Sequence, residues 1–162
     1  MIAHTPHILV PLDMSPLAEA VLPVAVTIAQ ATHRGLTLVT VAAPAESLIY
    51  VGDPARIPLD AARRWEMDEM VQARDYLAGV QYDLQADHLP LHTEVIVASE
   101  VPTALIAYVA DHPQIEMIAM TTHGYTGFRH WAMGSVAEAV LHATNVPLLL
   151  LRTEASGKRA AS

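Results

Sequence analysis

Apolar residues along this chain occur in short continuous runs, separated by longer segments in which they recur about every three to four positions. The continuous runs predict buried strands, since a strand that is covered on both faces has no polar side. The segments between them predict amphipathic helices. The predicted strands are residues 7–12, 36–42, 91–98, 116–122 and 146–152, and the predicted helices are residues 16–34, 61–87, 101–111 and a final stretch that begins at Ser135.

The alternation of strands and helices predicts the fold class. Strands that are each followed by a helix form βαβ units, and such units build a mostly parallel sheet with helices on both faces. We therefore expect a single α/β domain over residues 1–152, with five strands and four helices. Residues 43–60 have no clear period and predict an irregular crossover. Residues 153–162 are small and polar, and we expect a flexible tail there.

The first helix has recognisable ends. Ser15 followed by Pro16 predicts its start, because the hydroxyl can cap free amides and proline suits the first turn. Pro23 lies inside the helical pattern and predicts a bend, since it cannot bond to the carbonyl of Glu19. Gly35 predicts the end of this helix.

Composition and charge narrow the possible partners. A chain of 162 residues with 52% hydrophobic residues is long enough to bury one core. Its formal net charge of −8 argues against nucleic acid and anionic membranes, because both attract basic surfaces. The absence of cysteine excludes disulfides and thiolate chemistry. No apolar run is long enough to span a bilayer and no leader pattern precedes the first strand, so we expect a cytoplasmic protein.

Residues 122–135, THGYTGFRHWAMGS, carry the candidate chemistry. Gly124 follows the fourth strand and Gly134 precedes the last helix, where glycine lets a ligand approach the backbone closely. Ser135 and Glu138 fit a capping box at the start of that helix. A helix N-terminus presents free N–H groups and partial positive charge, so the segment suits a phosphate. The same residues also suit a loop that only turns the chain, and residue types alone leave both interpretations open.

Two long stretches resemble the universal stress protein family. Residues 122–152, THGYTGFRHWAMGSVAEAVLHATNVPLLLLR, resemble its C-terminal signature, and residues 7–29, HILVPLDMSPLAEAVLPVAVTIA, resemble its first strand and helix. The resemblance implies a five-stranded open sheet in the order 3-2-1-4-5, an adenine nucleotide alpha hydrolase-like fold. It also implies a homodimer formed through the last strand, residues 146–152, which would otherwise leave an apolar sheet edge uncovered.

The nucleotide-binding branch of that family has the pattern Gly, two residues, Gly, nine residues, then Gly followed by Ser or Thr. The second and third glycines fall on Gly124 and Gly134, and the final hydroxyl falls on Ser135. Thr121 stands at the position of the first glycine. Its β-branched side chain resists positive φ and adds bulk beside the path that the phosphates would take.

The resemblance further implies an adenine-nucleotide site where the strand order reverses, which is where open parallel sheets bind ligands. Asp13 would contact the adenosine, or else only turn the chain after the first strand. His123 would face the pocket, or else satisfy carbonyls of its own loop. Pro11, Leu12 and Val41 would surround the base. The complete set of expected site residues is Pro11, Leu12, Asp13, Val41, Thr121, Thr122, His123, Gly124, Gly134, Ser135 and Val136.

Two functions remain as alternatives. The first is a regulatory module that binds ATP or AMP, with Mg²⁺ as a phosphate counterion and with little or no hydrolysis. The second is a stress-response interaction protein that binds no nucleotide and acts through dimerisation and partner docking. An enzyme acting on adenylates is less expected, because the sequence offers no recognisable set of nucleophile, general base and arginine finger. Nine histidines include no H-E-x-x-H or similar ligand pair, which argues against a dedicated metal site.

Overall fold

The computed structural model of the protein describes residues 5–50, 58–85, 88–122 and 133–153. Within these residues, five parallel strands form one open sheet in the order β3-β2-β1-β4-β5. The α/β class and the strand order expected from the sequence are therefore confirmed. The strands are β1 (His7–Pro11), β2 (Gly35–Ala42), β3 (Leu91–Val97), β4 (Ile115–Thr121) and β5 (Leu148–Leu151).

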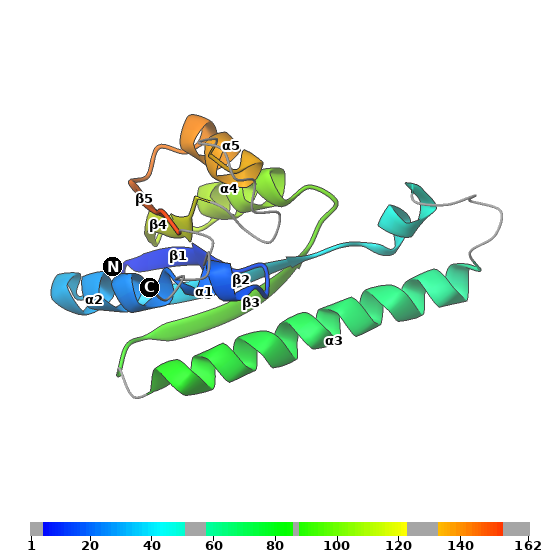
Figure 1. Ribbon diagram of the computed structural model, residues 1–162, viewed down its shortest axis with the longest axis horizontal. Coiled ribbons are helices and arrows are strands. Elements are labelled where there is room, and N and C mark those ends of the chain that lie inside the picture. The colour runs from blue at the N-terminus through cyan, green and yellow to red at the C-terminus, as the bar shows by residue number, and fades with distance from the viewer. Residues whose placement is uncertain (1–4, 51–57, 86–87, 123–132, 154–162) are drawn as a thin grey trace, which may run out of the picture.

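Helices cover both faces of the sheet (Figure 1). One face packs against α1 (Pro16–Glu19), α2 (Leu22–Thr32) and α3 (Leu59–Leu84). The other face packs against α4 (Val101–Asp111) and α5 (Ser135–Ala143). The central strand β1 supplies both cores, because its side chains alternate: Ile8 and Val10 face the first group of helices and Leu9 faces the second. All three side chains are fully buried.

The first predicted helix is two helices in the structure. The expectation of one bent helix is wrong, because α1 ends at Glu19 and α2 begins at Leu22. Ala20 and Val21 between them keep right-handed helical dihedral angles, but their N–H groups bond three residues back, to the Leu17 and Ala18 carbonyls. Pro23 lies in the first turn of α2, where its missing N–H costs no hydrogen bond. The proline therefore starts a helix, and the residues before it form the separate four-residue helix α1.

The predicted role of Gly35 is also wrong. His33 ends α2 in a left-handed conformation, with φ 54° and ψ 41°. Gly35 is instead the first residue of β2, where a Cβ atom would lie 2.5 Å from Nε2 of His7 and 2.7 Å from the carbonyl oxygen of Pro90. The His7 side chain and the Pro90 carbonyl leave no room for a Cβ atom, which is what requires glycine at this position.

The crossover after β2 contains a short 3-10 helix, η1 (Ala45–Tyr50), and α3 begins at Leu59. Along α3, Ala73, Leu77 and Val80 are buried against the sheet, as the spacing of apolar residues predicts. The N-terminal half of α3 extends beyond the strands together with η1 (Figure 1). None of the helices in the described part of the chain is long and apolar enough to cross a membrane. The predicted tail falls almost wholly outside the described residues.

Candidate functional site

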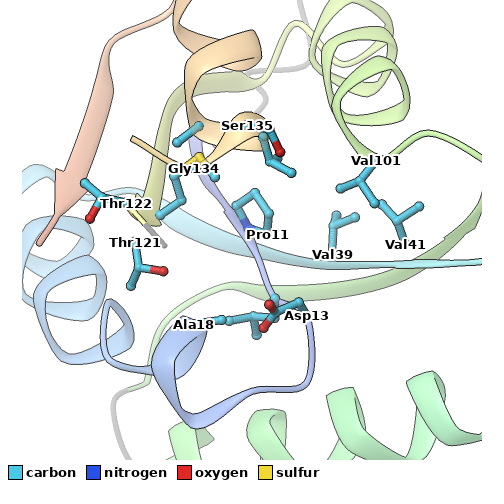
Figure 2. A pocket seen from close by; sticks show the side chains of 14 residues that line it. Pro11, Asp13, Ala18, Val39, Val41, Val101, Thr121, Thr122, Gly134 and Ser135 are labelled. Atoms are coloured by element: carbon cyan, nitrogen blue, oxygen red, sulfur yellow. The ribbon is translucent and has the colours of Figure 1, made fainter. Parts of the chain in front are cut away.

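A pocket of about 220 Å³ opens at the carboxyl ends of β1, β2 and β4, where the strand order reverses. Figure 2 shows Asp13 and Ala18 on one side of it, Gly134 and Ser135 on the opposite side, and Pro11 between them. Ligands of open parallel sheets bind at this place. The lining residues are Pro11, Leu12, Asp13, Ala18, Val39, Val41, Val101, Met120, Thr121, Thr122, Gly134, Ser135, Val136 and Ala137.

One wall of the pocket is apolar. Val39 and Val41 lie two positions apart on β2 and so share a face of the strand. Val101, the first residue of α4, lies beside them (Figure 2). Pro11 closes this wall from β1, whose end is fixed to β2 by the hydrogen bond from Leu12 N–H to the Val39 carbonyl at 2.8 Å. A wall of this kind suits the flat face of an aromatic base.

Asp13 lies in a tight turn between β1 and α1. Its Oδ1 accepts hydrogen bonds from Ser15 N–H at 3.1 Å and from Ser15 Oγ at 2.5 Å. Ser15 in turn caps α1, because its Oγ accepts the Ala18 N–H at 3.1 Å. Met14 between them has φ 62°, a left-handed conformation that costs a non-glycine residue about 1 kcal/mol or more. The carboxylate both turns the chain and borders the pocket.

The end of β4 connects the pocket to the last strand and the last helix. Thr122 N–H donates to the Leu151 carbonyl at 3.0 Å, and the Thr122 carbonyl accepts the Gly134 N–H at 2.7 Å. The preceding residue, Thr121, is 6% exposed. Among the described residues, positive φ occurs only at Met14, His33 and His88, so the β-branched Thr121 carries no backbone strain.

The start of α5 differs from the predicted capping box. Gly134 is the N-cap, with φ −60° and ψ 147°, and its carbonyl accepts the Glu138 N–H at 3.0 Å. Ser135 is therefore the first helical residue and not the cap, because the chain turns into the helix one residue earlier. Among the described residues, no group accepts the N–H of Ser135, Val136 or Ala137. All three residues line the pocket, so its second wall carries backbone donors that the described part of the chain leaves without an acceptor.

Sequence comparison identifies the family. The family model described as "Universal stress protein family" matches residues 4–152. The chain belongs to the universal stress protein family. Among curated proteins, none matches the chain significantly.

Solved structures share the fold of this universal stress protein. MJ0577 has 21% identity and a TM-score of 0.77, with 93% of this chain and 97% of that chain covered. UspA from Lactobacillus plantarum has 24% identity and a TM-score of 0.74, with 93% and 99% covered. The universal stress protein from Archaeoglobus fulgidus in complex with dAMP has 18% identity and a TM-score of 0.60, with 93% and 98% covered. Two further neighbours are described with cAMP and, in Arabidopsis thaliana, with AMP.

The pocket of this family member contains nine of the eleven expected site residues, from Pro11 in β1 to Val136 in α5. His123 and Gly124 lie outside the described residues, so their assignment stays a prediction. Sequence reasoning missed five lining residues. Val39 could have been predicted, because it lies two positions from Val41 on the same strand and so on the same face. The other four residues line the pocket only because of how their helices and strands pack together. The missed residues are Ala18, Val39, Val101, Met120 and Ala137.

The pocket holds little ionisable chemistry. Among its described lining residues, Asp13 is the only ionisable side chain. The described residues also contain no group of three or more His, Asp or Glu side chains that could hold a metal ion. The site can therefore orient a ligand through backbone donors, one carboxylate and apolar contact.

Proposed function

We propose that this universal stress protein is a regulatory module that binds an adenine nucleotide, ATP or AMP, in the pocket at the carboxyl end of the sheet. One observation carries the proposal: the pocket joins an apolar wall to three backbone donors at a helix N-terminus that have no acceptor among the described residues. A base suits the first feature and a phosphate the second. Relatives with the same fold that are described with dAMP, cAMP and AMP support it.

The proposed contacts follow from the two walls. Pro11, Leu12 and Val41 surround the base, and Asp13 accepts hydrogen bonds from the ribose. The phosphate meets the amides of Ser135 and Val136. The remaining proposed phosphate contacts are Thr121, Thr122, His123, Gly124 and Gly134.

The size of the pocket bears on the choice of ligand. Its volume of about 220 Å³ is below the range of about 300–1,000 Å³ that is common for small-molecule sites. Thr121 contributes to this narrowness, because its buried side chain fills space that a glycine would leave. The pocket therefore favours AMP over ATP. The same narrowness is the observation that favours the alternative function, a stress-response interaction protein that binds no nucleotide.

We propose binding without rapid hydrolysis, since a phosphate cradle alone does not cleave phosphate. Asp13 is the only ionisable side chain among the described lining residues, and its Oδ1 already accepts two hydrogen bonds from Ser15. Mg²⁺ in this proposal is a counterion held chiefly by the phosphates. The cytoplasmic location expected from the sequence belongs to the same proposal.

The proposed assembly is a homodimer through β5. The four leucines of this edge strand are all partly exposed, and an apolar edge strand needs a partner or a cover. The carbonyls of Pro147 and Leu151 face β4, where they accept N–H groups of Ile118 and Thr122. Backbone groups of a strand alternate in direction, so the N–H groups of Leu148 and Leu150 point away from β4, where a second copy can accept them.

Calorimetry and thermal unfolding with AMP, ADP and ATP, each with and without Mg²⁺, test this function. A bound ligand should raise the free energy of unfolding by about 2.7 kcal/mol at a hundredfold excess over Kd. Adenosine, which lacks the phosphate, measures what the phosphate contributes to binding. GMP, which carries a different base, measures the preference for adenine. An unfolding midpoint unchanged by millimolar nucleotide would favour the interaction protein. Phosphate release that disappears in Asp13→Ala would instead favour an enzyme.

A further inference from the structure

We propose that Tyr76 is a positioning residue for the pocket, because its hydrogen bond to Glu19 braces α1, the short helix that fixes the orientation of Asp13. The inference rests on the proposed nucleotide function. Tyr76 belongs to α3 and is not among the described residues that line the pocket. No part of the nucleotide-binding pattern includes it, so it would act on the ligand only through α1.

Two features of the pocket depend on α1. Ser15 Oγ accepts the Ala18 N–H and donates to Asp13 Oδ1, so the start of the helix and the carboxylate share one hydroxyl. Ala18 itself forms part of the pocket wall. A shift of α1 would therefore move the carboxylate and the wall together.

This helix needs support from outside. It has four residues, and a helix this short is unstable alone because nucleation is unfavourable. The turn that leads into it includes Met14 with φ 62°. A non-glycine residue keeps this left-handed conformation only where the surrounding structure enforces it. Ser15 caps one end of the helix. The other end leads through a tight turn into α2, with Ala20 N–H bonded to the Leu17 carbonyl and Val21 N–H to the Ala18 carbonyl, and a contact from α3 would hold this end as well.

Tyr76 supplies that contact. Its hydroxyl donates to Oε1 of Glu19, the last residue of α1, at 2.9 Å. The two residues are 57 positions apart, so the bond ties α1 to a separate helix packed on the same face of the sheet. Burial, and then the hydrogen bond to Glu19, raise the pKa of the Tyr76 phenol, and the charge of Asp13 adds to this rise. The phenol therefore stays protonated and donates, close to the carboxylate that it helps to orient.

A matched bond elsewhere in the chain provides the control. The Tyr108 hydroxyl donates to Glu94 Oε2 at 2.7 Å, again between a helix and a separate element, here α4 and the edge strand β3. Burial and the glutamate raise the pKa of Tyr108 as they do for Tyr76. Neither Tyr108 nor Glu94 is among the described pocket-lining residues. Loss of this second bond should affect stability and leave the ligand unaffected.

The first test measures AMP affinity by calorimetry for Tyr76→Phe and Tyr108→Phe. We expect Tyr76→Phe to weaken AMP binding about fivefold, the factor that matches the net contribution of one hydrogen bond, and Tyr108→Phe to leave it unchanged. Glu19→Gln keeps an acceptor for the phenol and should retain affinity, whereas Glu19→Ala should weaken AMP binding by about the same factor as Tyr76→Phe. In a double-mutant cycle, Tyr76→Phe should add nothing to Glu19→Ala.

The second test needs no nucleotide. Amide hydrogen exchange at Ser15 and Ala18 should accelerate in Tyr76→Phe and remain at the wild-type rate in Tyr108→Phe. AMP affinity that is unchanged in Tyr76→Phe, or reduced equally in both variants, overturns the positioning role. If the wild-type protein binds no AMP, the proposed function fails, and faster exchange in Tyr76→Phe would still support the brace. Unchanged exchange would overturn the brace as well.

Discussion

At the amino end of the sheet no side chain fits at Gly35, because the His7 side chain and the Pro90 carbonyl lie too close, whereas at the carboxyl end a pocket opens where the strand order reverses. The amino end pairs its backbone groups: Gly35 N–H donates to the Pro6 carbonyl at 2.9 Å and Leu36 N–H to the Pro90 carbonyl at 2.8 Å. The carboxyl end presents the N–H groups at the start of α5, for which residues 5–50, 58–85, 88–122 and 133–153 provide no acceptor.

The difference separates stability from ligand binding within one sheet. A close-packed end with paired backbone groups contributes to the free energy of unfolding and offers nothing to a ligand. Backbone donors without an acceptor beside an apolar wall contribute little to the free energy of unfolding. They contribute much to the affinity for a ligand that has both a phosphate and an aromatic base. Substitutions at the two ends should therefore change different measured quantities.

The largest expected effect is on stability, from Gly35→Ala. The added methyl group would lie within 3 Å of His7 and of the Pro90 carbonyl, and such overpacking costs about 1–3 kcal/mol. Gly79→Ala in α3 is the control, because its Cβ meets nothing within 4 Å and alanine favours helix by up to about 1 kcal/mol. Urea unfolding measures both variants. If Gly35→Ala is as stable as Gly79→Ala, the amino end is not close-packed.

Gly134→Val should lower ligand affinity and leave stability nearly unchanged, the opposite of Gly35→Ala. The extended backbone of Gly134, with φ −60° and ψ 147°, accepts valine, but the new side chain would occupy the pocket. We expect AMP affinity to fall by about tenfold or more, with unfolding little changed. Ser135→Ala retains the backbone donor and should lose less affinity. Calorimetry and circular dichroism separate the two effects, and a Gly134→Val protein with wild-type affinity would contradict the proposed location of the phosphate.

Leu150→Pro tests whether the edge strand β5, which runs from the amino end to the carboxyl end of the sheet, forms the dimer interface. The substitution removes one N–H group that points away from β4 and retains the bonds to β4. In sedimentation experiments we expect a dimer for the wild-type protein and a monomer for the variant. Leu150→Val keeps the N–H group and should stay dimeric. A negative charge at Leu149 or Leu150 should also give monomers, and a Leu150→Pro dimer would move the interface elsewhere.

The smallest effect is a pH dependence at the amino end. Burial, and then the nearby His92, lower the pKa of His7 below its usual 6.5. The folded state favours neutral His7, so its stabilising contribution is present above pH 6.5 and is lost as the pH falls from there through the folded pKa. Unfolding measured at about pH 7.5 and about pH 5.5 should show a smaller change for His7→Gln than for the wild type. Equal changes would exclude His7 as the cause.

The sequence predicts the central strands because they are buried on both faces and so consist mostly of apolar residues, as in LTLVTVA of β2. The wrong predictions concern residues whose type is compatible with two different structural roles. Pro23 can bend a helix or lie in its first turn, and in the structure it lies in the first turn of α2. Gly35 can end a helix or permit close packing, and the outcome depends on His7 and Pro90.

The site was predictable in part for the same reason. Pro11 to Asp13 and the region of Gly134 and Ser135 occupy strand and helix ends, which topology brings together at the reversal of strand order. The hydrogen bond between Tyr76 and Glu19 could not be predicted, because neither periodicity nor motif relates two residues 57 positions apart. The sequence predicts Ser135 as the cap of α5, whereas Gly134 is the cap, so the helix and its first backbone donors begin at Ser135, one residue earlier than expected.

Amide chemical shifts on addition of AMP and of adenosine test the central claim most directly, because they report on the N–H groups of Ser135, Val136 and Ala137 individually. We predict that saturating AMP shifts all three amide signals, and that adenosine, which lacks the phosphate, shifts signals near Val39 and Val41 while leaving those three in place. AMP that saturates the protein without moving the Ser135, Val136 and Ala137 signals would contradict the account.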